Sequence, residues 1–112
     1  MVHDPSPDSA RLGLHIRLEA KPEHAKAVEE LLTGALALAQ EEEFTTAWFA
    51  LRLGPTTFGV FDVFGNEEDR TAHLRGKIAA ALLQQAPHLL AAAPEILPVD
   101  VLAAKLAGSP RP

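Results

Sequence analysis

The segment Phe58–Phe64, with the sequence FGVFDVF, constrains the fold of this chain more than any other. Bulky apolar residues occupy both sets of alternating positions, so a strand formed here would carry apolar side chains on both faces. Such a strand has to be covered on both faces. A chain of 112 residues has few helices for that purpose. We therefore expect helices to cover one face of the sheet and a second copy of the chain to cover the other.

Other segments are also predicted to be strands. Leu12–Glu19 alternates leucine or isoleucine with glycine or polar residues, which is the period of a strand. Thr46–Leu53 is rich in β-branched and bulky residues. A Gly-Pro-Thr turn joins it to the segment Thr57–Phe64, which predicts a hairpin. The last strand, Ile96–Lys105, contains Pro98, which favours an edge strand or a bulge.

Two helices are predicted between these strands. The first begins at Pro22, whose missing N–H would be unpaired in the first turn of a helix anyway. It ends near the acidic run Glu41–Glu43, which we expect to be solvated. The second follows the N-cap residue Asn66 and runs to about Gln85. A short extra helix is expected over Pro87–Ala93. The inward stripe of the second helix is predicted to consist of Leu74, Ile78, Ala81 and Leu82.

The resulting order of elements, β-α-β-β-α-β, is that of the split βαβ or ferredoxin-like arrangement. It predicts an α+β fold with an antiparallel sheet and with helices on one face only. The other face would be a large exposed apolar patch on a monomer, which soluble proteins rarely keep. We therefore predict a homodimer in which two sheets pack face to face.

Length and composition limit the domain organisation, the possible partners and the location of the protein. We expect a single domain over residues 11–106, between a flexible arm, 1–10, and a tail, 107–112. The net charge of -5 and the absence of a basic block make nucleic acid and anionic membrane poor partners. No apolar run approaches the ~18 residues that span a bilayer. The lack of cysteine and the polar N-terminus fit a cytoplasmic location.

A pattern that joins the third strand to the second helix resembles the antibiotic biosynthesis monooxygenase superfamily. The segment Phe-Asp-Val-Phe is followed, after five residues, by Arg-Thr-Ala-His-Leu, and the resemblance extends roughly from Leu12 to Lys105. Members of this superfamily are small dimeric α/β barrels and include quinol monooxygenases. Those of known activity oxidise aromatic polyketides or quinols with O2, and they use no metal or flavin. The resemblance implies functional positions for Asp62, where many members have Glu, and for His73.

Other members of the wider group degrade heme. They use a polar residue on the first strand, a Trp in the second helix and, further along, an iron-binding His. Those positions hold His15, His73 and Leu83 in this chain. Because Leu83 replaces the iron ligand, the resemblance does not extend to heme binding.

His73 is the first candidate for a catalytic role. A neutral imidazole near pH 7 can take a proton from a phenol or quinol and can return it. The alternative is a surface or interface histidine that makes a structural hydrogen bond.

His15 and Arg17 form a second candidate group, because they share the strand face opposite Leu14 and Ile16. They would point into the interior of a dimeric barrel, His15 to handle a proton and Arg17 to hold a substrate oxygen. A buried arginine needs an acidic partner, and Glu19 and Asp62 are available. The alternative is a buried polar network that only stabilises the sheet.

Trp48, Arg52 and Phe61 complete the candidate substrate-binding residues. Trp48 can stack on a flat substrate or fill the core. Phe61 is one of several phenylalanines that can line an aromatic-binding cavity or belong to the core. The other histidines are not at metal-ligand spacing, so we expect no metal site and no cofactor.

Two functions therefore remain open. The first is a cofactor-independent monooxygenase that acts on a small aromatic, phenol-like or quinol-like substrate. In that chemistry the substrate anion supplies electrons to O2, and the protein has only to desolvate, deprotonate and hold it. The second is a non-catalytic, dimeric small-molecule-binding or stress-related protein with the same fold.

Overall fold

The computed structural model describes residues 10–107. The predicted arm and tail lie outside this range, apart from Ala10 and Ala107. Four strands form one antiparallel sheet in the order β2-β3-β1-β4. The strands are β1 (Leu12–Glu19), β2 (Ala47–Arg52), β3 (Thr57–Phe64) and β4 (Glu95–Asp100). The helical elements are η1 (Pro22–His24), α2 (Ala25–Gly34), α3 (Leu36–Glu41), α4 (Glu67–Leu74) and α5 (Lys77–Leu89).

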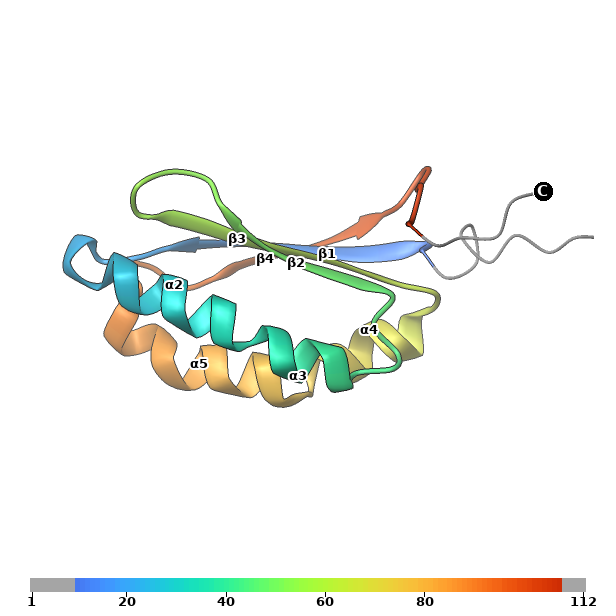
Figure 1. Cartoon of the computed structure of the whole chain (residues 1–112), viewed down its shortest axis with the longest axis horizontal. Coiled ribbons are helices and arrows are strands. Elements are labelled where there is room, and N and C mark those ends of the chain that lie inside the picture. The colour runs from blue at the N-terminus through green and yellow to red at the C-terminus, as the bar shows by residue number, and fades with distance from the viewer. Residues whose placement is uncertain (1–9, 108–112) are drawn as a thin grey trace, which may run out of the picture.

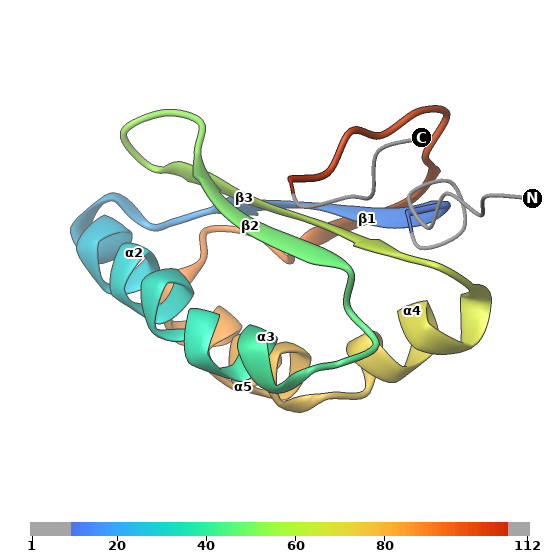
Figure 2. The same ribbon diagram turned by 45° about the vertical axis from the view of Figure 1, so that its right-hand side comes forward.

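The helices all lie on one side of the sheet (Figures 1 and 2). The predicted α+β, ferredoxin-like arrangement with an antiparallel sheet is therefore confirmed. Strand β3 begins and ends at the predicted residues. Pro98 lies in β4 at the edge of the sheet, where its missing N–H costs no hydrogen bond on the open side. Strand β4 ends at Asp100, which is earlier than predicted.

The helices differ from the prediction in their continuity. The first predicted helix is divided at Ala35 into α2 and α3. The second is divided at Arg75 and Gly76 into α4 and α5. The short extra helix does not form separately, because α5 continues through Pro87 to Leu89. Pro87 lies in the last turn of α5, where the loss of one N–H donor does not end the helix.

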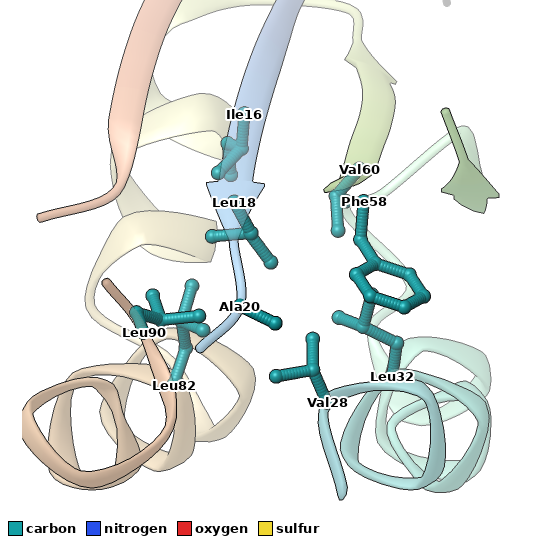
Figure 3. Close-up of a cluster of buried hydrophobic side chains, with 9 residues drawn as sticks. All are labelled: Ile16, Leu18, Ala20, Val28, Leu32, Phe58, Val60, Leu82 and Leu90. Atoms are coloured by element: carbon teal, nitrogen blue, oxygen red, sulfur yellow. The ribbon is translucent and has the colours of Figure 1, made fainter. Parts of the chain in front are cut away.

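A cluster of buried side chains fills the space between the sheet and helices α2 and α5 (Figure 3). Strands β1 and β3 contribute alternate residues to it, as their period of two requires. The buried members are Ile16, Leu18, Ala20, Val28, Leu32, Phe58, Val60, Leu82 and Leu90.

Leu74 is not buried in the core, although its side chain lines the cavity between the sheet and the helices. Leu74 is 39% exposed, whereas the preceding residue, His73, is 2% exposed. The sequence prediction treats residues 67–85 as one continuous helix. In such a helix Leu74 would lie on the same face as Ile78 and Leu82. Because α4 and α5 are separate helices, each has its own phase, and α4 turns His73 towards the sheet.

The opposite face of the sheet carries apolar side chains as well. Phe49, Phe61, His15 and Leu97 lie in one row across the four strands. Phe49 and Leu97 are 50% and 58% exposed. No helix within residues 10–107 covers this face (Figure 1), and none of the helices described there is long and apolar enough to cross a membrane.

Candidate functional site

His73 lies between two carboxylates, and the three residues form a compact cluster under the sheet. Its Nδ1 is 2.7 Å from Glu42 Oε1, and its Nε2 is 2.9 Å from Asp62 Oδ2. Asp62 is fully buried, and the Glu42 side chain is 10% exposed. Strand β3 supplies Asp62, helix α4 supplies His73, and Glu42 follows α3. Figure 2 shows α4 beside the segment that joins α3 to β2.

The local sequence explains how α4 presents His73. Asn66 caps the helix, since its side chain accepts a hydrogen bond from the Asp69 N–H at 2.9 Å. Acidic residues fill the first turn, and His73 lies in the last turn. Both placements complement the helix dipole, so a protonated His73 is favoured at the C-terminal end of α4.

Two further residues hold Glu42 against His73. The Thr45 hydroxyl donates to Glu42 Oε1 at 2.8 Å. Gly76, between α4 and α5, leaves room for the other carboxylate oxygen. A Cβ at Gly76 would lie 2.9 Å from Glu42 Oε2, which is too close for an unstrained contact.

The cluster favours the charged form of His73. Burial lowers the pKa of His73, but the close contacts to Asp62 and Glu42 and the charges of both carboxylates outweigh it, so the pKa is raised above the usual 6.5. An imidazolium can donate from both nitrogens, whereas a neutral ring would turn a lone pair towards one carboxylate. With His73 charged and both acids ionised, the cluster carries one net negative charge.

Asp62 is incompletely satisfied by this arrangement. The 2.9 Å contact between Nε2 and Oδ2 is an ion pair, but neither oxygen of Asp62 has a well-aligned hydrogen bond from the described residues. The indole Nε1 of Trp48 is also buried without a hydrogen-bond partner there. Buried polar atoms in native proteins nearly always have hydrogen-bond partners, so the unpaired atoms of Asp62 and Trp48 require an explanation.

An apolar cavity lies between the sheet and helices α2, α4 and α5. Its volume is about 80 Å³, and His73 is the one polar side chain in its wall within residues 10–107. Leu74, Leu83 and Ile96 line the cavity but are partly exposed to solvent. The cavity therefore reaches the surface where α4 and α5 face the edge strand β4.

The structure separates the other candidate residues from this cavity. Leu14 and Ile16 are buried under the helices, so His15 and Arg17 point away from the helices, as expected. Asp62 pairs with Leu14 across the sheet and lies on the helix side, where Arg17 does not reach it. Phe61 pairs with His15 and shares its face.

Of the predicted acidic partners of Arg17, Asp62 contacts His73 instead, and Glu19 interacts with Arg17 only through charge. Glu19 accepts hydrogen bonds from the hydroxyls of Thr56 and Thr57, both at 2.6 Å. These bonds lower the pKa of Glu19. Arg17 itself is exposed.

Trp48 and Arg52 lie on the helix side of β2. Trp48 packs against the core formed with α2, α3 and α5. Arg52 forms an ion pair with Glu29, and its guanidinium lies 5.4 Å from the centre of the Phe58 ring. Arg52 does not line the cavity.

The structure thus brings together two of the predicted catalytic residues, His73 and Asp62, and adds Glu42. The sequence predicts that Glu42 is solvated at a helix end, and this prediction is wrong, because its side chain is only 10% exposed. No local pattern identifies it, because 31 residues separate it from His73. Within residues 10–107 no group of three or more His, Cys, Asp or Glu side chains is arranged to hold a metal ion.

No family model and no curated protein sequence matches the chain. Among solved structures, the protein NE2512 of unknown function from Nitrosomonas europaea is 54% identical. The match covers 88% of this chain and 96% of that one, with a TM-score of 0.86.

More distant structures share the fold. A "putative antibiotic biosynthesis monooxygenase" from Caulobacter crescentus is 19% identical, with a TM-score of 0.70 over 86% of this chain and 93% of that one. PA3566 from Pseudomonas aeruginosa is 20% identical, with a TM-score of 0.73 over 86% and 98%. The chain therefore belongs to the family of the Nitrosomonas protein, and its fold is that of the antibiotic biosynthesis monooxygenase superfamily.

Proposed function

We propose that the protein is a cofactor-independent monooxygenase that oxidises a small phenol or quinol with O2. One observation carries this proposal: an otherwise apolar cavity has His73 in its wall, and the carboxylates of buried Asp62 and largely buried Glu42 hold that ring. An apolar cavity binds an aromatic ring and excludes water, and the cluster supplies proton transfer.

The charge of the cluster suits it to accept a proton. An imidazolium between two carboxylates is negative overall, so it becomes neutral when it takes a proton from the substrate hydroxyl. The proton would go to Asp62 Oδ1, which has no hydrogen-bond partner among residues 10–107, while His73 stays charged beside Oδ2. The substrate anion then faces a neutral cluster rather than a like charge.

The reaction needs no electrons beyond those of the substrate. For a phenol with hydrogen at the para carbon, the phenolate gives electrons to O2, and a carbon–oxygen bond forms at that carbon. The stored proton goes to the peroxide. Loss of the ring C–H proton then breaks the O–O bond, which leaves a quinone and one water. Both hydrogens of the water come from the substrate.

The shape of the cavity limits the substrate. The volume of about 80 Å³ limits a ligand to no more than a single small ring, and the exposed side chains of Leu74, Leu83 and Ile96 give the cavity an apolar entrance. Leu83 occupies the position at which the heme-degrading members carry their iron ligand. It lies at this entrance and offers no ligand atom.

A second function is favoured by the same cluster. Both nitrogens of His73 already contact carboxylates, so a substrate finds no free ring nitrogen. A non-catalytic protein that binds a small molecule in this cavity would keep that arrangement as a purely structural network.

The proposed active form is a homodimer joined through the open face of the sheet. Phe49, Phe61 and Leu97 would become buried there, with His15 among them. An unpaired apolar face of this kind is unusual on a monomer.

Oxygen uptake with a panel of phenols, quinols and naphthols tests the catalytic proposal. We expect at least one compound to consume one O2 for each quinone formed. Asp62→Asn should lower the rate strongly, whereas Arg52→Gln, away from the cavity, should not. If ligands bind but none supports uptake by the folded wild-type protein, the binding function is correct instead.

A further inference from the structure

Trp48 and Asp62 face each other across the hairpin formed by β2 and β3. They are register partners on the helix side of the sheet. The Cβ atoms of such a pair are typically about 4.5–5.5 Å apart, so their side chains share one small space. Trp48 Nε1, Asp62 Oδ1 and Asp62 Oδ2 are all buried, and none has a hydrogen-bond partner among residues 10–107. His73 reaches only Oδ2, through the ion-pair contact.

The two free atoms define the chemistry of the group that would join them. The indole N–H only donates, and the Asp62 carboxylate accepts. A hydroxyl group satisfies both atoms at once, since it accepts from the indole and donates to the carboxylate. An anion would be repelled by Asp62, and a cation would have to enter among apolar side chains. Trp48 packs against a cluster of Ala35, Ala39 and Ile78.

Neither Trp48 nor Asp62 lines the cavity, but three residues of the cavity wall connect it to this space. His73 contacts Asp62 and also lines the cavity. Ala35 and Ile78 line the cavity and belong to the cluster that packs against Trp48. A ring in the cavity could therefore direct a hydroxyl past His73 towards Asp62, whereas its apolar edge would remain among the aliphatic side chains.

We propose that Trp48 Nε1 and Asp62 Oδ1 form a binding site for one neutral hydroxyl group. Water fills it in the free protein, and the hydroxyl of a phenolic ligand replaces the water when the cavity is occupied. The replacement by a phenolic hydroxyl rests on the proposed function, because it assigns the phenolic oxygen to a specific pair of residues. The water-binding site in the free protein does not rest on it.

The chain contains one tryptophan, so a ¹⁵N-labelled sample gives one indole resonance, which reports directly on this site. In the free protein we expect cross-relaxation between the indole proton and a bound water. Phenol should abolish that signal and shift the indole resonance. Toluene, in which a methyl group replaces the hydroxyl, should bind in the cavity and leave the water signal in place.

Variants give an independent measurement. Trp48→Phe removes the N–H but keeps an aromatic ring, and calorimetry can compare phenol with toluene. We expect the preference for phenol to fall about 10-fold, since a hydrogen bond to a buried site typically has an effect of that order. Arg52→Gln, on the same strand but away from the cavity, should leave the preference unchanged. If Trp48→Phe does not fold, the indole measurement on wild-type protein still decides the matter.

The outcomes test the water-binding site and the assignment of the phenolic hydroxyl separately. A water signal that persists at saturating phenol, with an unchanged indole shift, overturns the substrate assignment but supports the water site. An indole proton that shows neither water nor phenol contact overturns the whole inference. None of these measurements uses O2, so failure of the proposed oxidation would be recognised separately.

Discussion

At the scale of single residues, a substitution of His73 is expected to change both the activity and the stability of the protein. The sequence leaves open whether this histidine has a catalytic role or makes a structural hydrogen bond. In the structure it contacts two carboxylates, those of the buried Asp62 and the largely buried Glu42. Removing one partner of a buried charge cluster leaves uncompensated charge, which is strongly destabilising. Loss of activity in a His73 variant therefore has to be separated from loss of folded protein.

The first prediction concerns His73→Ala. We expect this substitution to lower the free energy of unfolding by about 3–5 kcal/mol, because Asp62 and Glu42 lose their shared cation. Urea denaturation measures it. Leu74→Ala is the matched control and should cost less, since Leu74 is partly exposed. A larger loss for Leu74→Ala would show that Leu74, as the sequence suggested, is the inward residue.

The second prediction concerns pH. The folded-state pKa of His73 is raised above 6.5, so the folded protein holds this proton more tightly than the unfolded chain. The resulting stability is fully present below about pH 6.5 and is lost as the pH rises through the raised pKa. We expect the urea midpoint of wild type to fall over that interval. His73→Gln should lack this component, and an identical pH dependence of both proteins would refute the prediction.

At the scale of the elements, the break between α4 and α5 has a specific role. Gly76 allows Glu42 to approach His73, because a Cβ there would meet Glu42 Oε2 at 2.9 Å. The carboxylate is at the end of a flexible side chain, but its bonds to Thr45 and His73 hold it in place. The break therefore gives α4 its own phase and also makes room for the second carboxylate.

The third prediction compares two glycines. Gly76→Ala should destabilise the protein by about 1–3 kcal/mol, since Glu42 must move away from its partners. Gly34→Ala is the control, because a Cβ at Gly34 would have no atom within 4 Å. Alanine is the better helix former, so Gly34→Ala should stabilise by about 0.5–1 kcal/mol. Thermal melts of both variants measure this, and equal effects would argue against the role of Gly76.

At the scale of the whole molecule, the sheet divides the protein into two different environments. The helix side holds the core, the cavity and the charged cluster. The open side holds exposed apolar residues with His15 among them. The two candidate histidines, His15 and His73, therefore lie on opposite sides of the sheet. A dimer formed through the open face would bury His15 directly and would reach His73 only through the sheet.

The fourth prediction is the dimer itself. Sedimentation at micromolar concentration should give twice the 12.0 kDa chain mass, with an interface above ~2,000 Å² in total. Phe49→Lys should dissociate it, because the charge would lie in the apolar interface. Leu36→Lys is the control, since Leu36 is similarly exposed but lies on α3 in the helix layer. A wild-type monomer, or equal dissociation by both variants, would exclude this interface.

The sequence alone determined the order of the elements, the bounds of β3 and the apolar character of both sheet faces. These features depend on neighbours along the chain: alternation along a strand, a Gly-Pro turn and an Asn cap before an acidic first turn. The same local patterns identified Asp62 and His73 as residues of one strand and the next helix. They also placed His15 and Arg17 on the face opposite Leu14 and Ile16, which the structure confirms.

Only the tertiary structure decided which residues meet. The phase of α4 depends on where the helix breaks, so sequence periodicity assigned Leu74 to the core instead of His73. Glu42 approaches His73 from 31 positions away, where no spacing rule connects them. Trp48 and Asp62 share a space because the register of the hairpin pairs them across two strands. Packing between distant elements sets these contacts, and a linear pattern does not contain them.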